Sequence, residues 1–379
     1  MYKRLLKKQI KSKLFSGKAI IITGARQTGK TTLALEIIGE IKPKKKTRLI
    51  NCDNPTDRVL LSNKNLDFLK QLVGDAEIIF IDEGQKAETI GQTLKLLVDY
   101  YKKKKQFIVT GSSSFNLLDR TEEALTGRKF VFRLFPLSAE EIFPDKNFLS
   151  FQKSLEGLLI YGSYPEVVQQ KSFEDKQDLL LSITSSYLYK DILEFRAIKN
   201  PEILTSLLKA LSLQIGKEVS YTEISNLIGI DKKTVESYID ILEKSYIIFR
   251  LPPYYSNRRK EISKLRKIYF YDVGIRNAVI NNFNFLDARG DIGELWENYL
   301  MVERMKFQTY HKIIANNYFW RTYDGTEIDL VEDGGGKIVG YEFKWNEKKG
   351  RMRAPDKWKE YKNSGYKIVT PKTIQDFII

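Results

Sequence analysis

One eight-residue run restricts the fold of this chain more than any other feature. Residues 24–31 read G-A-R-Q-T-G-K-T, with glycine at the first and sixth positions. The run follows an apolar, β-branched segment at residues 19–23 and precedes a helix-like segment at residues 32–38. A glycine loop between a strand and a helix is the context in which this pattern binds phosphate, and a chance match in a loop is the alternative. We therefore expect a phosphate-binding loop here.

The residue types of this loop suit the phosphates of ATP or GTP. Gly24 and Gly29 allow the backbone turns that direct N–H groups inward, and the N-terminus of the following helix favours anions. Lys30 would contact the phosphates as a point charge, and the Thr31 hydroxyl would bind Mg²⁺. The expected nucleotide contacts are Gly24, Ala25, Arg26, Gln27, Thr28, Gly29, Lys30, Thr31 and Thr32.

A second apolar run ends in two acids. Residues 78–81 read as a strand buried on both faces of a parallel sheet, and Asp82 and Glu83 follow directly. Asp82 would hold Mg²⁺, and Glu83 would orient and polarise the attacking water. Two acids at a strand end also cap helices, but their pairing with the glycine loop favours nucleotide hydrolysis.

Two further features are expected near the γ-phosphate. Thr110 and Ser112 end another buried strand and are candidates for sensing this group, with a glycine–serine turn that caps the next helix as the alternative. Arg128 would act as an arginine finger, within the chain or across a subunit boundary, and a surface salt bridge is its alternative. Alternating strands and helices predict that residues 1–150 form a parallel α/β core.

Helical patterns follow this core. Residues 151–200 are expected to form a helical lid and linker, and residues 201–285 contain a helix, a turn at Gly229, a second helix at 231–242 and two strand-like segments. This order is the outline of a winged helix. Its DNA-facing side chains would be Lys232, Lys233, Ser237, Tyr238, Arg258, Arg259 and Lys260. Docking of a protein partner is the alternative, and three acids on the second helix favour it.

Residues 286–379 contain a predicted hairpin on which acids and a lysine converge. If Asp333 pairs with Ile338 across a four-residue glycine loop, Asp329 falls opposite Glu342. The candidate metal ligands and catalytic groups are Asp329, Glu342, Lys344 and, from a preceding helix, Glu294 or Glu297. Such a set binds Mg²⁺ and activates a water for attack on phosphorus. An exposed Glu–Lys pair and a site used only for binding are the alternatives.

Composition restricts the partners. The 379 residues include 63 Lys and Arg against 48 Asp and Glu, a net charge of +15, which favours DNA, although lysine-rich usage by the host is an alternative. The single cysteine, Cys52, excludes an intramolecular disulfide and favours a reducing, cytoplasmic location. The single histidine, His311, argues against a histidine-rich zinc site. No apolar run approaches about 18 residues, so no membrane partner is expected.

Several short segments carry a resemblance to a known family. They read G-A-R-Q-T-G-K-T-T-L, I-I-F-I-D-E, T-G-S-S, L-T-G-R with F-P-L-S, Y-G-S-Y-P-E, L-E-K-S-Y-I-I, Y-F-Y-D-V-G-I, G-E-L-W-E-N, and E-I-D-L-V with Y-E-F-K. These segments are spread over nearly the whole chain. In them the chain resembles a widespread prokaryotic family of AAA+-type P-loop ATPases with a C-terminal domain of unknown function.

The resemblance implies a P-loop ATPase core, a winged helix and a C-terminal domain similar to the PD-(D/E)XK nuclease fold. It assigns the nucleotide roles to Lys30, Thr31, Asp82 and Glu83, and the nuclease-like roles to Asp329, Glu342 and Lys344. The chain departs from the family at residues 83–85, where E-G-Q stands in place of a bulkier residue and a nearby histidine.

Three hypotheses follow. The first is a Mg²⁺-dependent ATPase that acts on DNA and whose C-terminal domain binds or cleaves DNA. The second is an ATP-dependent regulatory switch that binds a protein or DNA partner without cleavage. The third is a ring-shaped motor that remodels branched DNA, which would require a homo-oligomer with Arg128 acting in trans.

Overall fold

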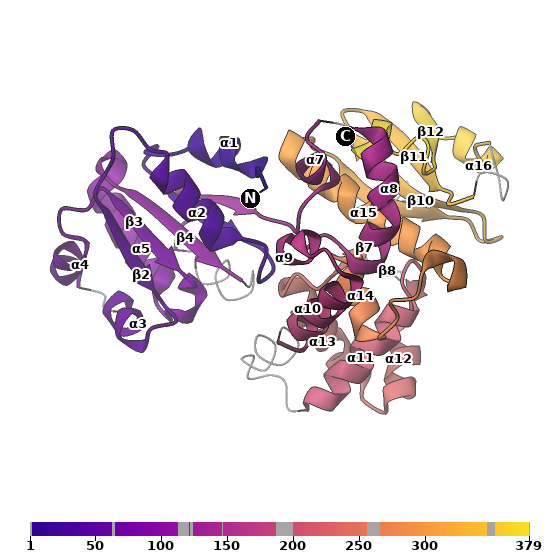
Figure 1. Cartoon of the computed structure of the whole chain (residues 1–379), viewed down its shortest axis with the longest axis horizontal. Coiled ribbons are helices and arrows are strands. Elements are labelled where there is room, and N and C mark those ends of the chain that lie inside the picture. Colours follow the sequence, from indigo (N-terminus) through magenta and orange to yellow (C-terminus); the bar gives the residue numbers. More distant parts are fainter. Residues whose placement is uncertain are drawn as a thin grey trace. The chain divides into compact units, whose positions relative to one another are not determined.

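The computed structural model describes residues 2–62, 65–112, 121, 124–145, 147–186, 200–255, 266–346 and 353–378. The chain forms two compact units, and Figure 1 shows the elements of each. Unit 1 comprises Met1–Pro136 and Lys244–Tyr246, and unit 2 comprises Leu137–Glu243 and Ile247–Ile379. The division falls after Pro136 rather than near residue 150, and the segments expected to be a lid, a winged helix and a C-terminal domain share unit 2.

A five-stranded parallel sheet forms the centre of unit 1. Its strands are β1 (Ala19–Thr23), β2 (Thr47–Asn51), β3 (Ile78–Asp82), β4 (Gln106–Gly111) and β5 (Lys129–Arg133), in the order β2-β3-β4-β1-β5. The three inner strands β3, β4 and β1 are almost entirely buried, as expected for apolar runs in a parallel sheet. The predicted parallel α/β architecture is therefore confirmed.

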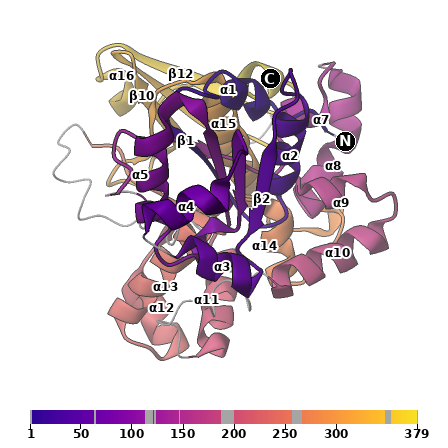
Figure 2. The same ribbon diagram turned by 90° about the vertical axis from the view of Figure 1, so that its left-hand side faces the viewer.

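The helices of unit 1 are α1 (Leu6–Lys11), α2 (Lys30–Gly39), α3 (Pro55–Leu61), α4 (Leu66–Val73) and α5 (Ile90–Tyr101), with short 3₁₀ turns η1 (Gly84–Lys86) and η2 (Lys102–Lys104). Figure 2 shows α1 beside α2, where Lys7 pairs with Glu36 at 2.6 Å and also with Glu40. Helix α3 was not predicted. Its start carries a recognisable signal, because Asn54 caps the helix and proline occupies its first position.

Unit 2 begins with a group of packed helices. They are α7 (Ala139–Ile142), α8 (Phe148–Tyr161), α9 (Pro165–Gln169), α10 (Phe173–Ser186) and α14 (Val273–Val279). Helices α8 and α10 both pack against α14, although α14 lies far along the chain. Residues 162–164 separate α8 from α9. Of the segment expected to be a helical lid and linker, residues 187–199 lie outside the described residues.

A buried carboxylate joins three distant segments of unit 2. Asp272 caps α14 by accepting from Gly274 N at 2.9 Å, and its other oxygen accepts from Ser163 N at 2.8 Å. Lys306 donates to Ser163 Oγ at 3.0 Å and to the carbonyl of Leu137 at 2.8 Å. Because these side chains are buried, loss of any of these hydrogen bonds would be costly. The network therefore fixes the segments at 137, 163 and 272 against one another.

The next part of unit 2 has the predicted order of elements. It contains α11 (Pro201–Leu213), β6 (Glu218–Val219), α12 (Tyr221–Ile228), α13 (Lys232–Lys244), β7 (Ile248–Leu251) and β8 (Arg266–Phe270). The strands form an antiparallel sheet in the order β6-β8-β7. Gly229 ends α12 with φ 73°, so the predicted helix, glycine turn and helix are confirmed. The expected wing residues Arg258, Arg259 and Lys260 lie outside the described residues.

The last part of unit 2 combines one long helix with a four-stranded sheet. It contains η5 (Leu286–Ala288), α15 (Ile292–His311), β9 (Asn316–Arg321), β10 (Glu327–Gly334), β11 (Lys337–Phe343), α16 (Asp356–Lys359), β12 (Ser364–Val369) and α17 (Gln375–Ile378). The sheet order is β12-β11-β10-β9, and α15 contacts β8, β11 and α8 (Figure 1). Although α15 has 20 residues, no helix in the described part of the chain is long and apolar enough to cross a membrane.

The single cysteine gives a simple test of unit 1. Cys52 follows β2 and is fully buried, and this burial raises the pKa of its thiol to about 12. Because the thiolate is the reactive form, we expect no reaction of the native protein with Ellman's reagent at pH 8. One thiol per chain should react after unfolding in guanidinium chloride. Rapid labelling of the native protein would contradict this packing.

Candidate functional site

The glycine loop has a backbone conformation that requires glycine. Gly24 has φ 147°, and a Cβ atom there would lie 2.0 Å from the carbonyl oxygen of Leu134. Gly29 has φ 88° directly before α2 begins at Lys30. Residues with side chains rarely adopt such angles. The loop therefore passes close to the end of β5 and turns directly into a helix N-terminus, as a phosphate-binding loop does.

Lys30 lies within this loop. Its side chain is almost fully buried, and its Nζ donates to the carbonyl oxygens of Gly24 at 2.9 Å and Ala25 at 2.7 Å. Thr28 Oγ1 donates to the same carbonyl of Ala25 at 2.8 Å. These bonds hold an ammonium group against the loop, at the place where the sequence predicted a cation for phosphates.

Arg4, in the N-terminal segment, holds the glycine loop in place, and no sequence motif predicted this role. Its guanidinium is buried and donates to the carbonyl of Thr28 at 2.7 Å and to that of Phe135 at 2.6 Å. One planar group thus fixes two main-chain segments. No pattern in the sequence distinguished Arg4 from the solvated lysines around it.

The acid-ended strand meets α2 as predicted. Thr31 Oγ1 donates to both carboxylate oxygens of Asp82, each at 3.0 Å. Thr110 Oγ1, from the end of the neighbouring strand β4, also donates to Asp82. The hydroxyl and the carboxylate predicted to hold Mg²⁺ are therefore adjacent, and their oxygen atoms are of the type that Mg²⁺ prefers.

Glu83 has two polar neighbours. Its φ of 51° is uncommon for a residue with a side chain and is typical of functional sites. Its carboxylate accepts from Gln85 Nε2 and lies 3.4 Å from Ser112 Oγ, while Gln85 also donates to Ser112 at 2.9 Å. Gln85 was missed as a site residue. The available signal was its position in the E-G-Q run, where the chain departs from the family that it resembles.

Arg128 lies at the opposite edge of the sheet. It directly precedes Lys129, which pairs with Ala19 at the start of β1, whereas Gly24 follows the end of β1. Because β1 and β5 are parallel, about 16 Å of strand separates Arg128 from the loop. Its Nε instead lies 2.5 Å from Asp99 Oδ1. An arginine finger within the chain is therefore wrong, and a role across a subunit boundary stays a prediction.

In unit 2, the predicted hairpin has the expected register and a shorter loop. Asp333 pairs with Ile338, as predicted, but Gly334 also pairs with Lys337. The connection is therefore the two-residue turn at 335–336, where both glycines have positive φ, rather than a four-residue loop. The pairing of β10 with β9 shifts register between Ile328 and Val331, so Asp329 and Leu330 lie at a bulge or irregularity of the strand. Bulges redirect side chains and are frequent beside functional sites.

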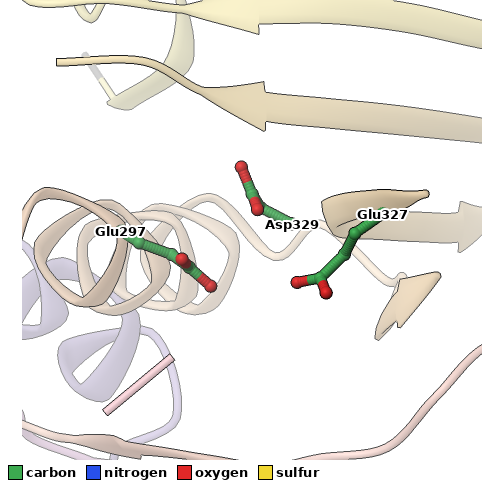
Figure 3. Close-up of side chains that lie close together, drawn as sticks. All are labelled: Glu297, Glu327 and Asp329. Carbon is green, nitrogen blue, oxygen red and sulfur yellow. The ribbon is translucent and has the colours of Figure 1, made fainter. Parts of the chain in front are cut away.

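Asp329 belongs to a cluster of three carboxylates. Glu297 of α15 and Glu327 of β10 complete it, and one oxygen atom of each lies within 4.8 Å of the others. Figure 3 shows the carboxyl groups of Glu297 and Glu327 pointing toward each other, with Asp329 beside them. Glu297 was one of two predicted alternatives. Glu327 was missed, although it stands two residues before Asp329 on one strand face.

A buried lysine neutralises this cluster. Lys267 of β8 is almost fully buried, and its Nζ pairs with Glu297 Oε1 at 3.0 Å and with Glu327. Burial lowers the pKa of Lys267, but the charges of Glu297, Asp329 and Glu327 outweigh this effect and raise it. Burial raises the pKa of Asp329, and Glu297 and Glu342 raise it further. The carboxylates therefore strongly favour a cation among them, and the Lys267 ammonium supplies one.

The remaining predicted residues of this region are more scattered. Lys344 Nζ lies 2.5 Å from Glu342 Oε1, and both side chains are partly buried rather than fully exposed. Glu342 is close enough to affect the pKa of Asp329. Glu294 lies outside the cluster, and its charge acts on Arg276 instead. The metal-ligand prediction for Glu294 is therefore wrong, because α15 turns Glu297 rather than Glu294 toward β10.

The predicted DNA-facing side of α13 is partly correct. Lys232, Lys233 and Ser237 are exposed. Tyr238 is buried, so its predicted place on this surface is wrong. Its position fits the apolar period of the helix, since Val235, Ile239 and Leu242 are buried with it.

Three family models match successive parts of the chain. Residues 16–143 match the family described as "AAA domain". Residues 152–285 match "Domain of unknown function (DUF8612)", and residues 292–376 match "Domain of unknown function (DUF4143)".

Relatives align along most of the chain. An uncharacterized protein of Mycobacterium tuberculosis, Rv2008c, is 24% identical over 340 residues, covering 89% of this chain and 72% of its own. An uncharacterized protein of Methanocaldococcus jannaschii, MJ1544, is 25% identical over 397 residues, covering 97% and 85%. Among solved structures, AMPPCP-bound DnaA from Aquifex aeolicus is 16% identical, covers 64% of this chain and 86% of its own, and has a TM-score of 0.29. That score is too low to support an argument about function.

Over residues 16–143 the chain is similar to an AAA domain. The parallel sheet of unit 1, its glycine loop and the contact between Thr31 and Asp82 agree with the match to an AAA domain. The residues present also fit ATP with Mg²⁺, because the glycine loop turns directly into a helix N-terminus and the oxygen atoms of Thr31 and Asp82 lie beside it.

The conformation of the glycine loop predicts the effect of adding one methyl group at Gly24. Gly24→Ala should abolish detectable binding of a fluorescent ATP analogue, because the new Cβ atom overlaps the carbonyl of Leu134. Gly39→Ala, in α2 and with no atom near the new Cβ, is the matched control and should bind normally. Thermal unfolding of both variants would separate misfolding from loss of the loop. Normal binding by Gly24→Ala would contradict the loop conformation.

Proposed function

We propose that unit 1 hydrolyses ATP in a Mg²⁺-dependent reaction. The observation that carries this proposal is the contact of Thr31 with Asp82, directly beside Glu83 and the buried ammonium of Lys30. In this proposal the backbone N–H groups of the loop and Lys30 bind the phosphates, while Thr31 and Asp82 hold the metal. When bound, Mg²⁺ neutralises charge on the phosphate oxygens.

Glu83 would orient the attacking water in this reaction. Gln85 and Ser112 support the assignment, because they restrict its carboxylate to one position before any substrate binds. A fixed carboxylate loses less conformational freedom on reaching the transition state. Thr110 would report on the metal site through its hydrogen bond to Asp82.

Two substitutions separate binding from hydrolysis. Lys30→Ala should abolish nucleotide binding or turnover, because the loop loses its cation. Glu83→Gln should bind ATP normally and hydrolyse it about 10²-fold or more slowly, because it cannot polarise the water. Phosphate release and binding of a fluorescent ATP analogue measure the two effects. Lys95→Ala, an exposed lysine of α5, is the control, and normal hydrolysis by Glu83→Gln would exclude this role for Glu83.

We further propose that the ATPase acts on DNA and that residues 201–285 form a winged helix. The order of α11, β6, α12, α13, β7 and β8 supports the winged helix, and the +15 charge supports DNA. Exposed Lys232 and Lys233 on α13 are the candidate phosphate contacts. A protein partner is the alternative for this surface, since Asp231, Glu236 and Asp240 lie on or beside the same helix.

For the C-terminal region we propose a nuclease-like PD-(D/E)XK fold that binds a protein or DNA partner and does not cleave DNA. The observation that favours this over a nuclease is Lys267, whose ammonium pairs with Glu297 and Glu327 beside Asp329. A metal bound by these carboxylates would have to displace a buried, paired lysine. That exchange leaves an unpaired buried cation, which costs several kcal/mol in general.

Lys267→Met tests this assignment. It should lower the free energy of unfolding by about 3–5 kcal/mol, because three carboxylates lose their cation. Lys344→Met is the matched control and should cost less than about 1 kcal/mol, since its ion pair is partly exposed. Mn²⁺ added without nucleotide should raise the melting temperature of Lys267→Met and leave that of the wild type unchanged.

A cleavage assay gives the contradicting outcome. The wild type would be incubated with linear, single-stranded and branched DNA, with Mg²⁺ or Mn²⁺, with and without ATP. Under this proposal the DNA stays intact. Cleavage that is lost in Glu342→Ala would establish a nuclease and reject the structural role of Lys267.

A further inference from the structure

The excess positive charge belongs almost entirely to unit 1. Residues 1–136 contain 27 Lys and Arg and 14 Asp and Glu, a net of +13, whereas residues 137–379 contain 36 and 34, a net of +2. Lysine-rich usage by a host would affect both parts of the chain. The cause of this difference in net charge must therefore lie within unit 1.

Most of this charge stands at the starts of the parallel strands. Four lysines at residues 42–46 precede β2, and four at 102–105 precede β4. Lys18 precedes β1, and Arg128 precedes β5. The register joins these points in one row, since Thr47 pairs with Ile78, Ile78 with Gln106, and Ala19 with Lys129. Parallel strands begin at the same edge, so these residues lie opposite the glycine loop.

We call this surface the basic edge. It comprises residues 42–46 and 102–105 with Lys13, Lys18, Arg128 and Lys129. Contacts show that its segments adjoin. The Nζ atoms of Lys13 and Lys18 lie 5.2 and 5.1 Å from the centre of the Phe130 ring, and the Nζ atom of Lys45 lies 5.0 Å from the centre of the Phe15 ring. Gly17 lies against the main chain of Lys102 and the side chain of Lys103.

Few acids neutralise the basic edge. Asp75 pairs with Lys46, Glu77 with Lys45 at 2.5 Å, and Asp99 with Arg128 at 2.5 Å. Among the described residues, these three ion pairs involve three of the twelve basic residues of the edge. The lysines at 42, 44 and 102–104 are exposed, and they form no ion pair with any residue that the structure describes. Holding so many like charges together is unfavourable unless an anionic partner binds them.

We propose that the basic edge binds the phosphate backbone of a nucleic acid without base specificity. Five strands about 4.8 Å apart extend about 19 Å, a length over which duplex DNA carries about 11 phosphate charges. Lysines bind phosphates as mobile point charges, which suits contacts that need no fixed register. This inference deepens the proposed action on DNA, on which it rests, by assigning a DNA contact to the ATPase domain itself.

An anionic membrane surface is the less favoured partner. The neighbouring helix α1 is basic and amphipathic, but its apolar residues Leu6 and Ile10 are 1% and 0% exposed. A helix that binds membranes must insert its apolar face among the lipids. Here the apolar face of α1 is already buried within unit 1. A membrane surface would therefore be attracted by charge alone.

Fluorescence anisotropy with the full chain tests the proposal. The probe is a fluorescein-labelled 30-base-pair duplex, titrated between 50 and 200 mM salt. The edge variant carries Lys44→Glu, Lys102→Glu and Lys104→Glu. The control carries Lys153→Glu, Lys171→Glu and Lys217→Glu in unit 2, at positions that are also exposed and that have no proposed role in DNA binding. Each triple variant changes the net charge from +15 to +9, so total charge is matched.

The edge variant should bind about tenfold or more weakly at 100 mM salt, with a salt slope about 3 smaller, and the control should resemble the wild type. Equal losses in both variants, or a loss in the control alone, would overturn the proposal. Wild-type binding to phosphatidylserine vesicles but not to DNA would overturn it as well. ATP hydrolysis without DNA is measured in parallel. Its absence in the wild type would reject the proposed ATPase reaction. No DNA binding by the wild type would reject the action on DNA together with the basic edge, whereas equal DNA binding by the wild type and the edge variant would reject the basic edge alone.

Discussion

The parallel pairing of β1, β3 and β4 is the constraint on which unit 1 depends. Parallel strands have all their carboxyl ends at one edge, so the glycine loop, Asp82 and Thr110 meet there although about 80 residues separate the first from the last. The same geometry gathers the segments that precede the strands at the opposite edge. One register therefore produces both the cluster around the glycine loop and the row of lysines, and it also places Arg128 far from the glycine loop of its own chain.

Unit 2 depends on buried charges that are matched within the fold. Lys267 stands among Glu297, Glu327 and Asp329, and removal of the lysine would leave these acids without their cation. Three carboxylates this close to one another would bind a metal ion if no other cation lay among them. Here the Lys267 ammonium already lies among them. The lysine comes from β8 and the acids come from α15 and β10, so the pairing also ties the two sheets of unit 2 together.

Several segments that carry the family resemblance have a structural role. F-P-L-S, Y-G-S-Y-P-E and Y-F-Y-D-V-G-I meet where Asp272 accepts from Ser163 and Lys306 donates to the carbonyl of Leu137. Gly162 lies so close that a Cβ atom would fall 1.9 Å from Asp272 Oδ1. Such short polar motifs resemble catalytic signatures in a sequence. Here, buried hydrogen bonds and close backbone approach account for their residue types.

The sequence by itself determined the features that local chemistry dictates. Apolar runs identified the inner strands, the glycine loop identified the turn between β1 and α2, and the glycines at 334–336 with alternating residues gave the correct register of β10 and β11. Only the tertiary structure decided which charges meet. Arg4 at the loop, Gln85 at Glu83 and Lys267 among the acids are far from their partners in the sequence or lack a pattern of their own. Periodicity records which face of an element is buried, whereas the partner of a buried charge depends on how distant elements pack.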